Sequence, residues 1–154
     1  MTDTDGLHEE EHTLSSDDIT QYKAAADITN AALKAVVAAC VPGSKIASLC
    51  KVGDAVIADG VGKCFKGKGI EKGIAFPTCV SVNDVVGHFS PLEDDTTTIK
   101  EGDLVKIDLG THINGMIASS ATTIVCAANP LEFKVSKLFD PQEDGVILLR
   151  NGWV

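Results

Sequence analysis

Three side chains in the 154-residue sequence have types that chemistry at a shared site could use: His88, Asp108 and Ser119. A carboxylate can bind a cation or act as a general base, and a histidine can carry a proton near neutral pH. Each residue also has a simpler interpretation. Aspartate and histidine are commonly solvated or hydrogen-bonded surface groups, and Ser119 lacks the strand–turn–helix context of a serine nucleophile. The residue types alone therefore leave a functional and a structural role open.

A β-hairpin is expected to bring two of these residues together. Residues 104–109 alternate between apolar and polar, Asn114-Gly115 is a strong type I′ turn signal, and residues 116–125 return with β-branched side chains. With a two-residue loop, residue 108 opposes 121 and residue 110 opposes 119. Asp108 and Ser119 then share one face as diagonal neighbours, within about 8 Å at the backbone. The other face carries Val105, Ile107 and Leu109.

Two helices are predicted before this hairpin. The first covers residues 17–40, with serine and aspartate at its start and Pro42-Gly43 after its end. Its larger apolar residues return at helical spacing, and its alanines would allow close packing on a flat surface such as a sheet. The second helix covers residues 45–62, with Gly53 as a weak point in its middle. The residues of the first helix at helical spacing are Ile19, Tyr22, Ala26, Leu33, Val36, Val37 and Cys40.

A basic loop and a further strand follow the second helix. The loop holds Lys63, Lys66, Lys68 and Lys72 with glycines between them, and its simplest interpretation is a solvated connection. From residue 73 to 83 the pattern alternates, interrupted by Pro77, which indicates an edge position or a bulge. Residues 91–98 indicate a polar turn. Helices followed by strands predict an α+β fold, with the helices on one face of a sheet.

The composition limits the classes of function. The formal net charge of the chain is −9, which argues against binding to the phosphate backbone of a nucleic acid, DNA included. No run of apolar residues approaches the length needed to span a membrane. The first residues are acidic and polar, so we expect no secretory signal there. Residues 1–18 hold seven acids and no lysine or arginine, which predicts a disordered acidic tail. The five cysteines are widely spaced without a CxxC pair, which favours reduced, mostly buried thiols over a zinc site.

Several motifs, in this order, resemble the pita-bread peptidase fold. The resemblance is strongest to the proliferation-associated protein family, the ErbB-receptor-binding and ribosome-associated relatives of type II methionine aminopeptidase. It covers about residues 17–125. The motifs are Tyr22-Lys23, Ser48–Ala55, Lys72–Thr78 (KGIAFPT), Ser81–Asn83, His88–Pro91 (HFSP) and Glu101–Gly110 (EGDLVKIDLG).

The resemblance assigns roles to the three residues. In the aminopeptidases this hairpin supplies two aspartates to a two-metal site, whose metal pair activates water. The first aspartate falls on Asp108 and the second on Ser119, whose neutral hydroxyl cannot replace a bridging carboxylate. The inactive relatives also lack that second aspartate. They keep the histidine matched by His88, which contacts substrate in the enzymes. The resemblance therefore implies a vestigial site with no catalytic residue, metal or cofactor.

Three segments are expected along the chain. Residues 1–16 form an acidic disordered tail, residues 17–125 form the first half of a pita-bread domain, and residues 126–154 form a divergent C-terminal tail. The family's remaining metal ligands lie in a second half that we expect this sequence to lack. A truncated gene model and a real short form both explain this ending, and the sequence does not choose between them.

The resemblance implies a non-catalytic adaptor in the cytoplasm and nucleus. Its implied partners are the ribosome, RNA and regulatory proteins, in growth regulation and translation. The acidic balance of the chain does not support the RNA contact, which rests on the family alone. Two alternatives stay open: a divergent metal-dependent methionine aminopeptidase, and a truncated half-domain without independent function.

Overall fold

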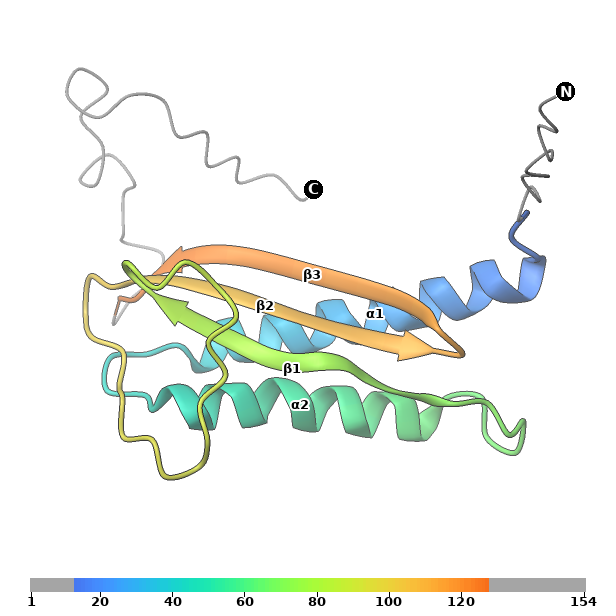
Figure 1. Cartoon of the computed structure of the whole chain (residues 1–154), viewed down its shortest axis with the longest axis horizontal. Coiled ribbons are helices and arrows are strands. Elements are labelled where there is room, and N and C mark those ends of the chain that lie inside the picture. Colours follow the sequence, from blue (N-terminus) through green and yellow to red (C-terminus); the bar gives the residue numbers. More distant parts are fainter. Residues whose placement is uncertain (1–12, 128–154) are drawn as a thin grey trace, which may run out of the picture.

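The structure, a computed structural model, describes residues 13–127. Two helices lie against one face of an antiparallel three-stranded sheet with the order β1-β2-β3 (Figure 1). The α+β class and the helices on one face of the sheet are as predicted. The elements are α1 (Ser16–Ala39), α2 (Ile46–Lys63), β1 (Lys72–Val82), β2 (Leu104–Ile113) and β3 (Met116–Val125).

The start of α1 is fixed by a capping box, in agreement with the predicted serine and aspartate signal. The Asp18 backbone N–H donates to Ser15 Oγ at 3.1 Å, and the Ser15 backbone N–H donates to Asp18 Oδ2 at 2.9 Å. These hydrogen bonds satisfy donors that the first turn leaves free. The Ser15 side chain and backbone both hold the pKa of Asp18 below its ordinary value.

The buried stripe of α1 matches the prediction in the second half of the helix, where Val36 is buried, but differs in the first half. Ile19 and Tyr22 are exposed, and residues with smaller or polar side chains face inward instead. The close approach of α1 to the sheet is the reason: the Thr29 hydroxyl donates to the Ala118 carbonyl on β3 at 3.1 Å. A bulkier stripe would hold the two layers further apart. The buried residues of α1 are Gln21, Ala25, Thr29, Ala32 and Val36.

The sheet has the predicted register. Asp108 opposes Ala121 and Gly110 opposes Ser119 across β2 and β3. The helix-facing residues of β2 are buried, whereas Asp108 lies on the opposite, open face. Strand β1 is both an edge strand and irregular, with register shifts on either side of Phe76, so both consequences expected of Pro77 are present.

A close contact between α2 and β1 holds this irregular strand. The backbone N–H and hydroxyl of Thr78 both donate to Asp54 Oδ1, at 2.9 and 2.8 Å, and the Thr78 side chain is fully buried. Gly53 permits the approach, because a Cβ there would lie 2.4 Å from Thr78 Oγ1. The glycine that weakened the helix prediction is therefore the residue that lets α2 reach β1.

The terminal segments lie mostly outside the described residues. Of the expected tails, only residues 13–16 and 126–127 are described. Cys126 is buried and joins residues 102–103 through backbone hydrogen bonds of 2.8 Å. Within residues 13–127, no helix combines the length and apolar character needed to cross a membrane.

The Gly53 contact generates a prediction about stability. We expect Gly53→Ala to destabilise the fold by about 1–3 kcal/mol, because the added methyl collides with the buried Thr78. Gly62 is the matched control in the same helix, because a Cβ there meets nothing within 4 Å. Gly62→Ala should stabilise the helix by up to about 1 kcal/mol. Urea denaturation measures both free energies of unfolding.

Two outcomes of that experiment are informative. Equal effects of the two alanines would contradict the close-contact interpretation of Gly53. A sharp, single unfolding transition of the unmodified chain as a monomer would contradict the alternative of a half-domain without a stable fold, which predicts low cooperativity.

The buried cysteines generate a second prediction. Burial raises the pKa of Cys40 to about 12 and that of Cys50 to about 11, whereas Cys64 is partly exposed. Because the thiolate is the reactive form, we expect maleimide to label Cys64 first at mildly alkaline pH. Cys40 and Cys50 should react only after denaturation. Peptide mass spectrometry measures the order, and Cys64→Ser should remove the fast phase. Native labelling of Cys40 or Cys50 at the rate of Cys64 would be inconsistent with this packing.

Candidate functional site

The segment after β1 folds back and carries His88 over the open face of the sheet. The Val80 backbone N–H donates to the Phe89 carbonyl at 2.8 Å, and the Phe89 N–H donates to Ser81 Oγ at 3.2 Å. His88 itself adopts a left-handed backbone, with φ of 58°. Its Nδ1 lies 3.7 Å from Asp108 Oδ2, and its side chain is 86% exposed. The histidine is thus held beside the carboxylate by its neighbours rather than by burial.

The base of the same segment is tied to β2. The Asn83 side chain accepts a hydrogen bond from the Leu104 N–H at 2.9 Å and donates one to Asp103 at 2.9 Å. The Lys106 amino group donates to the Asn83 carbonyl at 2.7 Å. Hydrogen bonds from Asn83 and the Lys100 backbone lower the pKa of Asp103. This polar cluster sets where the segment leaves the sheet.

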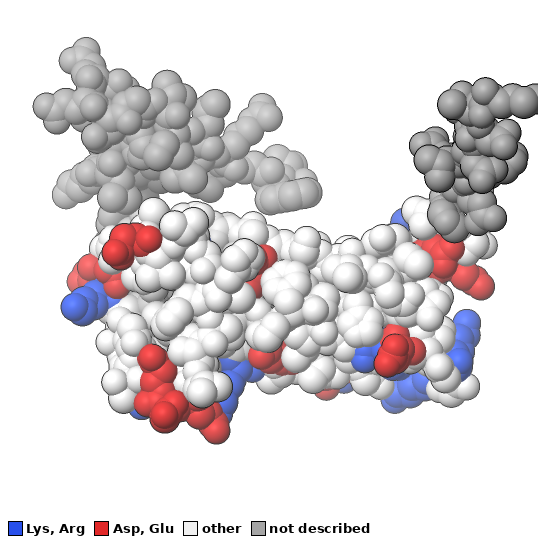
Figure 2. All heavy atoms as spheres, in the orientation of Figure 1, with Lys and Arg blue, Asp and Glu red and all other residues white. Residues whose placement is uncertain are grey.

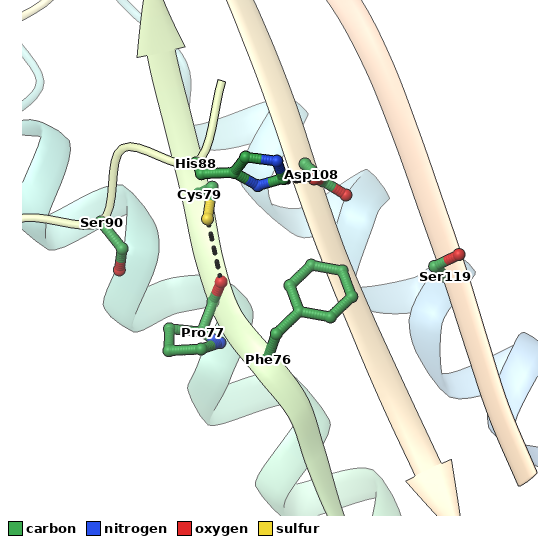
Figure 3. Close-up of a pocket in the computed structure, with 7 residues that line it drawn as sticks. All are labelled: Phe76, Pro77, Cys79, His88, Ser90, Asp108 and Ser119. Atoms are coloured by element: carbon green, nitrogen blue, oxygen red, sulfur yellow. Dashed lines mark hydrogen bonds and ion pairs between the residues drawn. The ribbon is translucent and has the colours of Figure 1, made fainter.

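The hairpin, β1 and the folded segment together line an open pocket. It has a volume of about 540 Å³ and lies on the open face of the sheet (Figure 3). The structure therefore brings the three residues singled out in the sequence to one place. The residues lining the pocket are Phe76, Pro77, Cys79, His88, Ser90, Asp108 and Ser119.

Four of these lining residues were given no role from the sequence. Phe76, Pro77 and Cys79 belong to the irregular part of β1, and Ser90 belongs to the segment that folds back. The Phe76 ring packs on Gly110, where a Cβ would lie 2.6 Å from the ring. Gly110 opposes Ser119, so the ring covers the sheet between Asp108 and Ser119 (Figure 3). The bulge signal of Pro77 was the sequence feature that could have indicated this wall.

Cys79 stands in the pocket as a neutral thiol. Burial, followed by the nearby carboxylates of Asp108 and Asp54, raises its pKa. Its Sγ donates to the Pro77 carbonyl at 3.2 Å (Figure 3). A thiol with a raised pKa is a poor nucleophile and a poor metal ligand. The pocket therefore offers one carboxylate, one imidazole and neutral groups.

This set of donors does not fit a metal ion. Among residues 13–127, no group of three or more histidine, cysteine, aspartate or glutamate side chains lies close enough to hold one. Ser119 contributes a neutral hydroxyl, and the Asp108 carboxylate is the anionic oxygen ligand among the residues lining the pocket. The described residues can instead bind a small polar or cationic group against Asp108, with the Phe76 ring as an apolar wall.

Comparison with known proteins identifies the family. The model of metallopeptidase family M24 matches residues 20–145, which extends beyond the span of the resemblance noted from the motifs. The ErbB-3 binding protein 1 of Arabidopsis thaliana is 46% identical over 134 residues, covering 85% of this chain and 34% of that protein. Proliferation-associated protein A of Dictyostelium discoideum is 50% identical over 123 residues, covering 79% and 32%.

A solved structure supports the fold. The methionine aminopeptidase of Thermotoga maritima superposes with a TM-score of 0.60 and 30% sequence identity, covering 74% of this chain and 44% of that one. The predicted pita-bread fold is thereby confirmed. The chain spans about a third of the length of the curated relatives it matches. On the family model and these similarities, the chain belongs to metallopeptidase family M24, together with the ErbB-3 binding and proliferation-associated proteins.

Proposed function

We propose that the chain is a non-catalytic, aminopeptidase-like adaptor. One observation carries the proposal: Ser119 lies on the open face diagonal to Asp108, at the position where the family resemblance expects a second aspartate. A bridging carboxylate holds two cations because it supplies two anionic oxygens, and a serine hydroxyl supplies neither. Asp108 and His88 are then remnants of a peptidase site.

The contacts that shape the pocket do not require a metal ion. His88 is held beside Asp108 by the backbone hydrogen bonds of Phe89, so its position does not depend on a metal. The Phe76 ring and the Pro77 and Cys79 side chains form a wall next to it. Such a pocket suits binding of a peptide end or a small polar group more than turnover of a peptide bond.

The second candidate is a divergent metal-dependent methionine aminopeptidase. The similarity to the Thermotoga maritima enzyme favours it, since the fold around the pocket is shared. It requires Ser119 to serve in place of the second aspartate and further ligands to come from outside residues 13–127. A shared fold does not by itself supply a reaction, so the adaptor is the better-supported function.

The partners follow from the family. The similarity to ErbB-3 binding and proliferation-associated proteins supports a role in growth regulation. We include translation, and a place in the cytoplasm and nucleus, on the motif resemblance alone. We include the ribosome, RNA and regulatory proteins as partners because the motif resemblance is to ribosome-associated relatives. The net charge of −9 weighs against a DNA partner.

A peptidase assay tests the absence of catalysis. We expect no release of methionine from a peptide with N-terminal methionine in the presence of cobalt or manganese, by the chain or by Ser119→Asp. Restoring one carboxylate still leaves too few donors among the described residues to hold a metal pair. An authentic methionine aminopeptidase is the positive control. Metal-dependent release at a comparable rate, abolished by Asp108→Asn, would overturn the adaptor proposal in favour of the enzyme.

Sedimentation of the natural protein tests the partners. An antibody raised to residues 17–125 should detect the protein in the ribosomal fractions of a sucrose gradient of source-cell lysate, and ribonuclease should move it to lighter fractions. The intact mass of the captured protein shows which length of product sediments. Recovery in light fractions alone, at low salt and without ribonuclease, would contradict ribosome association.

A further inference from the structure

Strand β3 is an edge of the sheet, and no element within residues 13–127 lies beyond it (Figure 1). Cys126, just after the strand, uses both of its backbone groups on the β2 side. Its N–H donates to the Asp103 carbonyl and its carbonyl accepts from the Gly102 N–H, each at 2.8 Å. Backbone groups alternate in direction along an antiparallel strand, and the register of β3 on β2 is unbroken. The odd-numbered residues from 117 to 125 therefore direct their N–H and C=O groups to the open edge.

The side chains of β3 are complementary to a second copy of the same strand. None of them is charged, and the order of apolar and hydroxyl side chains reads the same in both directions from Ala121. When two β3 strands are set antiparallel with Ala121 opposite Ala121, each apolar residue faces an apolar one and each hydroxyl faces a hydroxyl. The other opposed pairs are Ile117 with Val125, Ala118 with Ile124, Ser119 with Thr123 and Ser120 with Thr122.

Pairing through Ala121 also meets the symmetry of a dimer. A twofold axis perpendicular to the sheet reverses the strand direction and keeps the open faces of both copies on one side. Directly opposed residues must then lie on the same face, and Ala121 opposite itself meets this condition. The backbone groups that the odd-numbered residues direct outward are then opposed as hydrogen-bonded pairs. The two sheets would join into one continuous sheet.

An apolar stripe of α1 lies along the same edge. Asn30 is on the β3 side of this helix, because Ser120 Oγ donates to Asn30 Oδ1 at 3.5 Å. Residues three or four positions apart share a helix face, so the stripe through Asn30 holds most of the larger apolar residues that the sequence predicted to face the sheet. All of them are exposed or only partly buried. These residues are Ile19, Tyr22, Ala26, Leu33 and Val37.

The layer geometry brings two α1 helices together when two β3 strands pair. Helix α1 packs against both β2 and β3, so its axis lies about half a strand spacing in from β3. Neighbouring strands are about 4.8 Å apart, which puts the two α1 axes about 10 Å apart across the twofold axis. Packed helices have this spacing. The apolar stripe on each α1 would then be covered by the α1 of the other copy.

We propose that the chain forms a twofold-symmetric dimer in which β3 pairs with β3 through Ala121 and α1 packs on α1. Charge does not oppose this contact. In the space-filling view, charged residues gather at the two ends and along the lower margin, whereas the visible upper margin, along which β3 runs, is mostly uncharged (Figure 2). An interface about 30 Å long and two layers deep covers about 600 Å² on each copy, as specific interfaces do. The dimer does not depend on the adaptor role.

Analytical ultracentrifugation of the 154-residue chain tests the dimer. We expect twice the monomer mass at high protein concentration and reversible dissociation on dilution. Ala121→Lys places two like charges opposite each other and should raise the dissociation constant at least about tenfold. Ala31→Lys, at an alanine exposed on α1 outside the stripe, adds the same charge and should leave the constant unchanged. A monomer throughout, or equal effects of the two variants, would overturn the proposal.

Disulfide cross-linking tests the register, in a Cys64→Ser background that removes the partly exposed native thiol. Ala121→Cys should form a covalent dimer on oxidation with copper phenanthroline, because the Cα atoms of a hydrogen-bonded pair are about 5.5 Å apart, within disulfide range. Ser119→Cys and Thr123→Cys should each fail alone, since each residue lies about 14 Å along the strand from its own copy, and should cross-link when mixed. Cross-linking of Ser119→Cys alone as fast as in the mixture, or none by Ala121→Cys, would contradict this pairing.

Discussion

The contact between Asp54 and Thr78 is the constraint on which the pocket depends. One carboxylate oxygen of the partly buried Asp54 on α2 accepts both hydrogen bonds that the fully buried Thr78 can donate. An unpaired donor at that depth would cost about 1–3 kcal/mol, so the bulge in β1 is held in one position. Phe76, Pro77 and Cys79 take their places in the pocket wall from that position. The helix layer thus determines the shape of the opposite face of the sheet.

Local patterns in the sequence were sufficient to predict the helices and strands. They also predicted the part of the site that lies on the hairpin. Asn114-Gly115 defines the turn, and the turn defines the register, so the shared face of Asp108 and Ser119 follows from two residues. The position of His88 could not be obtained in this way. It depends on the hydrogen bond from the Val80 N–H to the Phe89 carbonyl and on the one from the Phe89 N–H to Ser81 Oγ, which no periodicity encodes. In the first half of α1, the exposure of the larger apolar residues was also missed, because close packing on β3 selects small side chains there.

Under the proposed function, a serine in place of a carboxylate at residue 119 need not disturb the fold. Ser119 is exposed on the open face, and its neighbours pair through backbone hydrogen bonds that do not involve its side chain. The proposed adaptor could therefore lose a metal ligand and keep the pocket. The position of His88 likewise depends on hydrogen bonds of the neighbouring Phe89 backbone, so in the proposed adaptor it does not require a metal ion.

The two edges of the sheet are not equivalent. At β1, Pro77 has no N–H to offer and Val80 already donates to the segment that folds back, so an incoming strand finds few partners there. At β3, ten residues without charge or proline follow one another. Any strand that lengthens this sheet, from whatever chain, is therefore directed to the β3 side. It would arrive next to Ser119, and the pocket would acquire a new wall where it is now open.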